Sequence, residues 1–255
     1  MPEKVSTLEQ LDIIYQDQHL VAVNKPSGLL VHKSFIDRHE TRFALQMLRD
    51  QIGQYVYPVH RLDKPTSGVL LFALSSNVAR SLSEQFYNQL VHKNYLAVIR
   101  GHCPESGIID HALKEKLDKI SDKQSRKDKP AQPAVSHYSR LATVEIPIEV
   151  DRYPHSRYSL VSVQPKTGRK HQIRRHLKHI GHPIIGDAKH GKGVHNRFFQ
   201  DHYHCHRLML ACTSMHLQHP IDNTALTLDA PLDDTFTQLL EAFNWLRHIS
   251  ASDGL

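Results

Sequence analysis

One short stretch constrains this chain more than any other. It runs from His60 to Gly68 (HRLDKPTSG) and continues directly into the apolar residues 69–73 (VLLFA). Pro65 fixes the backbone and disfavours helix for the residue before it, and Thr-Ser-Gly continues a turn. The short apolar run that follows is rich in branched residues and predicts a buried strand. Asp63 is therefore predicted to be a loop carboxylate at the entrance to a rigid strand.

The charges beside Asp63 suggest a role for this carboxylate. Arg61 and Lys64 flank it, and nearby cations favour the ionised form of a carboxyl group. A permanently charged carboxylate suits a nucleophile or a stabiliser of cationic charge better than a proton donor. The alternative is a solvated turn in which Asp63 caps a backbone N–H. For a single loop aspartate that alternative is preferred, and only the complete string favours a catalytic interpretation.

Composition limits the class of protein. A chain of 255 residues can form one large domain or two small ones. Its formal net charge of +6 and pI of about 9.2 fit a polyanionic partner without requiring one. Three cysteines without a CxxC pair argue against a disulfide framework and a cysteine-rich zinc module. There is no signal-peptide pattern and no run of membrane-spanning length. We expect a soluble, cytoplasmic protein without membrane association.

Periodicity and turn residues predict the secondary structure. The segment 114–133 is basic and poor in apolar residues, and is interpreted as a loop or insert that is either solvated or in contact with RNA phosphates. A hairpin is expected around Asp222 and Asn223, followed by an amphipathic helix with Phe236, Leu239, Leu240, Phe243 and Leu246 facing inward. Helices are expected at 40–55, at 77–90 with Ser76 as N-cap, and after Gly168, where Ile173, Leu177 and Ile180 form the apolar face. Strands are expected at 13–15, 20–23, 29–32, 69–73, 93–101, 134–144 and 157–163.

Two further motifs contain side chains that could take part in binding or catalysis. Residues 93–101 (KNYLAVIRG) predict a strand with Tyr95 near its start. Residues 164–177 (QPKTGRKHQIRRHL) predict a turn and then a helix with a basic stripe that includes Arg174. On pattern alone, Tyr95 is an ordinary strand aromatic, and the basic stripe is a surface that lies on phosphates.

Together these motifs resemble the RluA family of pseudouridine synthases. HRLD-x-x-TSG-x-LLFA is similar to the family signature, and KPSG, K-x-Y and P-x-T-G-R-x-H-Q-I-R-x-H-L match further family motifs in order. The resemblance implies an α+β fold with a curved, mostly antiparallel mixed sheet, flanked by helices and loops, beside a central basic cleft. It also implies isomerisation of uridine to pseudouridine in RNA, without a cofactor or a metal.

The resemblance assigns expected roles to individual residues. Asp63 is the expected catalytic carboxylate, Tyr95 the ring that packs against the target uracil, and Arg174 the partner of Asp63. An arginine can hold a carboxylate bidentately and fix its aim. One departure is Ala211-Cys212, where many family members have a histidine after R-L-x-L. Side chains expected to bind the RNA substrate are Arg61, Lys93, Arg169 and Lys170.

Within the family, the chain is most similar to members that modify uridine 65 in the acceptor stem of tRNA. The basic insert and the short N-terminus carry this similarity. We expect a single catalytic domain over 1–255, without a separate N-terminal RNA-binding domain, acting as a monomer with no obligate protein partner. A ribosomal RNA uridine is the nearest alternative substrate, and a non-catalytic RNA-binding protein is an alternative from another class.

A serine hydrolase and a zinc protein are weaker interpretations of this chain. A hydrolase using Ser67 lacks the G-x-S-x-G context and an identifiable acid partner. The histidines in 202–206 (HYHCH) have the right chemistry for zinc, but on one strand alternating side chains cannot all reach one ion. We therefore expect no metal site.

Overall fold

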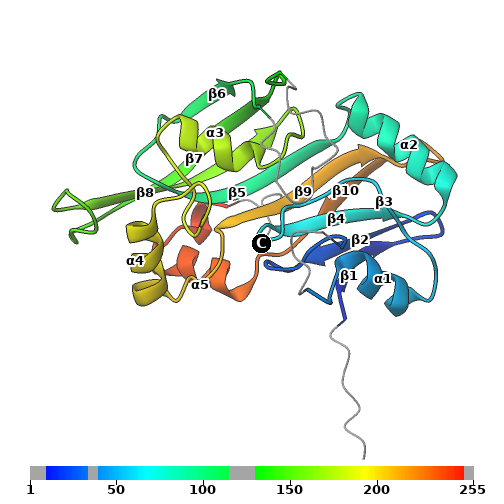
Figure 1. Ribbon diagram of the computed structural model, residues 1–255, viewed down its shortest axis with the longest axis horizontal. Coiled ribbons are helices and arrows are strands. Elements are labelled where there is room, and N and C mark those ends of the chain that lie inside the picture. The colour runs from blue at the N-terminus through cyan, green and yellow to red at the C-terminus, as the bar shows by residue number, and fades with distance from the viewer. Residues whose placement is uncertain (1–9, 34–39, 115–129, 250–255) are drawn as a thin grey trace, which may run out of the picture.

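The computed structural model describes residues 10–33, 40–114 and 130–249, and within these ranges the chain is organised around one ten-stranded sheet (Figure 1). The main path of the sheet is β1-β2-β4-β9-β5-β8-β7-β6, with β10 paired to β9 and β3 to β4. The strands are β1 Asp12–Gln16, β2 Leu20–Lys25, β3 Tyr57–Pro58, β4 Ser67–Ala73, β5 His92–Arg100, β6 Ser106–Asp110, β7 Val135–Ile146, β8 Ser156–Pro165, β9 Leu210–Gln218 and β10 Ala225–Asp229.

Helices lie beside this sheet rather than between its strands. In Figure 1, α1 and α2 lie toward the end that holds β1 to β4, and α3 and α4 lie toward the end that holds β6 to β8. None of the helices in the described part of the chain is long and apolar enough to cross a membrane. The helices are α1 Ala44–Ile52, α2 Ser76–Tyr87, α3 Gln172–His179, α4 Gly193–Tyr203 and α5 Asp234–Ala242, and a short 3-10 helix covers Leu246–His248.

The strand pairing confirms the predicted mixed, mostly antiparallel sheet of an α+β protein. Each named pair of strands is antiparallel except β4 with β9, which are parallel and meet only at Ser67–Ala211 and Gly68–Cys212. All seven residues of β4 are buried, as predicted from the apolar run after the aspartate loop. Complete burial of each large apolar side chain contributes roughly 1.5–3 kcal/mol, so β4 is a firm base for the loop that precedes it.

The parallel junction depends on Gly68. Its φ is +106°, and a Cβ at this position would lie 2.0 Å from the carbonyl oxygen of Cys212. We expect Gly68→Ala to lower the free energy of unfolding by roughly 3 kcal/mol, because the backbones of β4 and β9 must separate. Urea denaturation measures the change. Gly168→Ala is the control, since nothing lies within 4 Å of its added methyl group, and an equal loss in both variants would contradict this account of the junction.

Most predicted elements are confirmed, with small shifts at their ends. The hairpin of β9 and β10 surrounds Asp222 and Asn223, and Phe236, Leu239 and Leu240 of α5 are buried. Helix α1 ends at Gly53, which has φ +69°. The N-cap of α2 is Ser75 rather than the predicted Ser76, because the Ser75 hydroxyl accepts a hydrogen bond from the Val78 N–H.

The strand predicted at 29–32 is wrong. Residues 30 and 31 instead hold the start of α1: the carbonyls of Leu30 and Val31 accept hydrogen bonds from the N–H groups of Ala44 and Leu45. The Leu29 carbonyl accepts a hydrogen bond from the side chain of Lys25. These carbonyls are therefore engaged elsewhere, and Leu30 forms only an isolated bridge to Phe43.

Helix α4 is absent from the sequence-based prediction, and residues 202–206 are not a strand. Residues 202 and 203 end α4, and His204 adopts a left-handed conformation as its C-cap. Phe199 and Tyr203 pack against Phe243 in an aromatic cluster, with ring centroids 6.2 and 5.0 Å from that of Phe243. Tertiary packing of these rings holds a helix that begins with glycine and has a weak periodic pattern.

The insert predicted at 114–133 lies mostly outside the described residues. Its base is closed by an antiparallel bridge in which Leu113 and Gln132 exchange N–H···O=C hydrogen bonds of 2.8 and 3.1 Å. Arg169, just ahead of α3, donates a hydrogen bond to the carbonyl of Pro133. The base of the insert is thus fixed beside the start of α3.

Candidate active site

A buried lysine, Lys25, supports the aspartate loop through hydrogen bonds to backbone carbonyls. Lys25 is fully buried, and its ammonium donates to the carbonyls of Pro26 and Leu29 at 2.8 Å and of Lys64 at 3.2 Å. Burial lowers the pKa of Lys25 to about 7, and Arg207 nearby acts in the same direction, whereas Asp63 raises it. The three carbonyls satisfy the three donors of the ammonium.

The KPSG turn also contacts the aspartate loop directly. The Ser27 hydroxyl donates to the carbonyl of Pro65 at 2.7 Å, and the Gly28 N–H donates to the carbonyl of Lys64 at 2.9 Å. These contacts give the KPSG motif an architectural role, because they fix the backbone directly after Asp63.

Arg174 connects Asp63 to a second carboxylate. One terminal nitrogen of Arg174 donates to Asp63 Oδ2 at 3.0 Å, while Nε and the other terminal nitrogen donate to the two oxygens of Asp187, both at 2.8 Å. The side chain of Arg174 is 6% exposed and that of Asp63 is 16% exposed. The bidentate grip suggested for Asp63 is therefore made with Asp187, and Asp63 receives one charged hydrogen bond.

The two carboxylates of Asp63 and Asp187 stabilise the charge of Arg174 between them. Burial alone would raise the pKa of Asp187, but Arg174 and the backbone N–H groups of His190 and Lys189 hold it below its usual range. Burial opposes the charge of Arg174, yet Asp187 and Asp63 together raise its pKa. A buried arginine with two carboxylates has a fixed position and charge, and it presents one N–H to Asp63.

A pair of histidines borders Asp63. His171 Nε2 lies 3.9 Å from Asp63 Oδ2, and His171 Nδ1 lies 2.9 Å from His190 Nε2. Burial lowers the pKa of His171 to about 4, against the opposing effect of Asp63, so the ring is neutral at pH 7. When His190 Nε2–H donates to His171 Nδ1, the single N–H of the neutral His171 is on Nε2 and faces the carboxylate.

Tyr95 approaches the same region from β5. It is 8% exposed and pairs with Cys212 across the β5–β9 ladder, beside a register shift. Burial raises the pKa of Tyr95 well above its ordinary value, and Cys212 and Asp63 raise it further. The phenol is therefore protonated at neutral pH. Cys212, at the position of the departure from the family pattern, lies against Tyr95, and burial raises the pKa of its thiol to about 12.

His60 of the signature supports the loop as a neutral ring. Its Nε2 accepts a hydrogen bond of 2.9 Å from the Leu71 N–H in β4, and its ring stacks on Phe86 at 5.0 Å. Burial lowers the pKa of His60 to about 3, and Lys93 adds to the effect. An accepting nitrogen carries a lone pair, so protonation breaks this hydrogen bond.

This geometry predicts how stability depends on pH. Between about pH 6.5 and 3 the unfolded His60 binds a proton that the folded one does not, so its contribution to stability is lost as the pH falls through this window. His60→Gln keeps an acceptor without a titrating group, and we expect its urea midpoint to fall less than that of the wild type between pH 7 and 4. Parallel curves for the two proteins would contradict this prediction.

The structure separates the four predicted substrate-binding residues into two groups. Arg61 is exposed in the aspartate loop, and Arg169 is exposed just ahead of α3. Lys170 is half-buried, next to His171. Lys93 is half-buried on β5, with its ammonium 5.5 Å from the ring centroid of Phe86.

The serine hydrolase and zinc interpretations lose support. Ser67 is buried, and the partner of its hydroxyl is Arg207, which donates to it at 2.7 Å, rather than a histidine base that would accept its proton. The His202 ring donates to the Phe198 carbonyl at the end of α4, apart from the exposed His204 and His206. Across the described residues, no group of three histidines, cysteines or carboxylates is placed to hold a metal ion.

Sequence reasoning missed Asp187, His190 and the buried role of Lys25. Asp187 lies in the stretch IIGDAKHG, which contains glycines and a turn, but nothing in the local pattern marks its carboxylate as the partner of Arg174. The available signal was chemical: an arginine that pairs with a carboxylate away from solvent needs more than one acceptor for its donors.

A family model, curated relatives and solved structures all indicate the same protein family for this chain. The model of the RNA pseudouridylate synthase family matches residues 19–179. The chain is 57% identical to "tRNA pseudouridine synthase C" of Yersinia pestis, over 92% of this chain and 91% of that protein, and 52% identical to the protein of the same name from Vibrio cholerae, over 92% and 96%. Among solved structures, human RNA pseudouridylate synthase domain containing 4 is similar, with a TM-score of 0.67, 27% identity and coverage of 91% of this chain and 93% of that one. The chain therefore belongs to the RNA pseudouridylate synthase family.

Proposed function

We propose that this protein converts a uridine of tRNA to pseudouridine, with Asp63 as the catalytic carboxylate. The single observation that carries the proposal is the bridge from Asp63 through Arg174 to Asp187, which fixes the orientation of the loop carboxylate. The relatives from Yersinia pestis and Vibrio cholerae, more than half identical to this chain, are named for pseudouridine synthesis in tRNA.

The reaction needs only rearrangement within the nucleotide. The N1–C1′ bond breaks, the uracil turns, and a C5–C1′ bond forms; C5 loses a proton and N1 gains one, so no redox partner or energy source is required. Asp63 acts at the ribose, either as the nucleophile at C1′ or as a base. Arg174 donates a hydrogen bond to this carboxylate and fixes its orientation, and the neutral His171 lies beside it.

Tyr95 is proposed to pack against the uracil. An aromatic ring offsets part of the stacking that a flipped base loses. The raised pKa of Tyr95 leaves the phenol protonated, which favours this packing role over the role of acceptor for the C5 proton. Tyr95→Phe is accordingly expected to retain more activity than Tyr95→Ala.

Cationic side chains around the site are proposed to hold the RNA in a basic cleft. Arg61, exposed next to Asp63, fills the space left by the flipped nucleotide or grips its phosphate. Flipping costs a few kcal/mol, which phosphate contacts offset. Arg169, Lys170 and Lys93 supply such contacts, and the basic side chains of the insert between Leu113 and Gln132 are proposed to add further phosphate contacts.

Uridine 65 in the acceptor stem is the proposed target, on the resemblance of the basic insert to that of the enzymes specific for this position. We also propose that a monomer acts, as a single domain, in the cytoplasm. The test uses purified protein and transcribed tRNA labelled with tritium at uridine C5. Release of one tritium per tRNA supports the reaction, and a tRNA with cytidine at position 65 then releases none. Release from ribosomal RNA but not from tRNA would contradict the substrate.

A further inference from the structure

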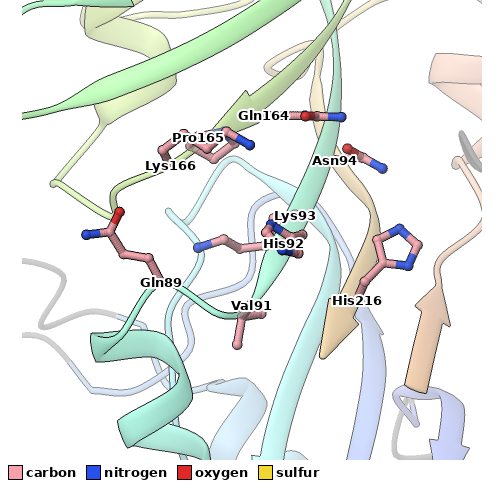
Figure 2. Close-up of a pocket in the computed structure, with 9 residues that line it drawn as sticks. All are labelled: Gln89, Val91, His92, Lys93, Asn94, Gln164, Pro165, Lys166 and His216. Atoms are coloured by element: carbon pink, nitrogen blue, oxygen red, sulfur yellow. The ribbon is translucent and has the colours of Figure 1, made fainter. Parts of the chain in front are cut away.

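A polar cavity lies beside the candidate active site. It has a volume of about 270 Å³ and opens where β5 begins and β8 ends (Figure 2). Its side chains come from β5, the end of β8, β9 and the turn after α2, and of the described residues that line it none carries a carboxylate. The polar lining consists mainly of Gln89, Lys93, Asn94, Gln164, Lys166 and His216.

Two lysines, Lys93 and Lys166, line the cavity. Burial lowers the pKa of Lys93, and the opposing effect comes from Cys212 rather than from a carboxylate. Among the described residues, the ring of Phe86 lies over this ammonium, at 5.5 Å from nitrogen to centroid. A partly desolvated cation without an acid partner is costly in the free protein, and a bound anion removes that cost. Lys166 lines the same cavity from the end of β8.

The position of the cavity relates it to the reacting nucleotide. Lys93 precedes Tyr95 by two residues on β5, so their Cα atoms are separated by about 6.6 Å along the strand. Both side chains interact electrostatically with Cys212, and Tyr95 also does so with Asp63. The cavity therefore lies about two residues along β5 from the proposed uracil site. This separation is short enough for a nucleotide next to the target uridine to occupy the cavity.

We propose that this cavity binds a nucleotide that flanks the target uridine, with Lys93 and Lys166 on its phosphodiester and the amides of Gln89 and Gln164 on its polar edge. Amide groups offer donors and acceptors together, so they fit a base edge or a ribose hydroxyl. The inference rests on the proposed function for the identity of the RNA, but binding at the cavity is measurable without catalysis.

Gln89 provides a variant that removes a cavity side chain without a packing defect. Its backbone has φ 59° in the turn after α2, a left-handed conformation that glycine adopts more readily. Gln89→Gly therefore removes the amide while relieving the backbone, so its thermal midpoint should not fall. Weaker RNA binding by this variant cannot be attributed to unfolding.

The test measures binding of transcribed tRNA to Asp63→Asn protein at several salt concentrations. Adding Lys93→Met or Lys166→Met is expected to weaken binding about tenfold and to reduce the slope of log K against log salt by about 0.7–0.9, the value for one phosphate contact. Gln89→Gly is expected to weaken binding without changing the slope. Arg247→Met, at an exposed arginine of the last 3-10 helix, is the control and should change neither.

A second arm locates the phosphate. A set of RNAs is made, each with one neutral methylphosphonate linkage at a different position near the modified uridine. One of these RNAs should bind more weakly than the unmodified RNA, and Lys93→Met should cause no further loss of affinity for that RNA. Unchanged affinity in both lysine variants, or an equal loss in Arg247→Met, would overturn the inference. Weakened binding together with a wild-type protein that forms no pseudouridine would support the cavity and reject the proposed function.

Discussion

Asp63→Asn should lower the rate of pseudouridine formation by more than about 10⁴-fold, the scale on which enzymes lose activity without a nucleophile or an essential base. Asparagine has the same shape, and its amide oxygen can still accept the hydrogen bond from Arg174, which now lies 3.0 Å from Asp63 Oδ2. It has no negative charge to act at the ribose. Affinity for tRNA should be unchanged, because the cationic side chains remain.

Single-turnover tritium release with saturating enzyme measures this prediction free of binding effects. Stability should fall by only about 1 kcal/mol, since the hydrogen bond to a charged donor is kept in weaker form. Asp201→Asn, at an exposed carboxylate on α4, is the matched control and should retain full activity. Activity within tenfold of wild type in Asp63→Asn would reject Asp63 as the catalytic carboxylate.

Asp187→Asn should damage both catalysis and the fold, although its side chain does not contact Asp63 in the described structure. The loss of charge leaves Arg174 buried with one carboxylate, and an asparagine amide can accept from only one of the two nitrogens that now donate to Asp187. Breaking a buried ion pair costs about 3 kcal/mol or more. A displacement of Arg174 by about 1 Å is expected to lower kcat roughly 100-fold, with little change in KM.

The kcat–KM split distinguishes positioning from loss of protein. Kinetics should be measured well below the unfolding midpoint, where each variant is folded. Arg174→Lys should show the same fall in kcat, because an ammonium cannot grip Asp187 bidentately and reach Asp63 together. Asp151→Asn, which breaks the more exposed ion pair with Lys192, should change neither stability nor kcat appreciably. Full activity in folded Asp187→Asn would show that the bridge to Asp63 is dispensable.

The local parts of this site were predictable from sequence. The loop of Asp63 and the buried β4 follow from proline, a turn and a branched apolar run, all within a few residues. The same is true of α3, whose basic and apolar residues recur with helical spacing. Local rules succeed here because each signal lies inside the element that it specifies.

The long-range parts were not predictable in this way. Asp63 and Arg174 are separated by 111 positions, and only the family resemblance paired them. Asp187 was missed because its partner is on another element, 13 positions away, and a carboxylate in a glycine-containing turn resembles many solvated ones. Helix α4 was missed for a related reason, since its aromatic residues are held by rings from the C-terminal segment rather than by local pattern.

The most direct test of the central claim maps pseudouridine by carbodiimide labelling and primer extension. RNA is compared from cells that lack this protein and from the same cells supplied with wild type, Asp63→Asn or Asp201→Asn. The account predicts that one stop in the tRNA acceptor region, at uridine 65, disappears without the protein and returns with wild type and Asp201→Asn, but not with Asp63→Asn. Return of the stop with Asp63→Asn would contradict the assigned chemistry, and loss of a ribosomal RNA stop instead would contradict the assigned substrate.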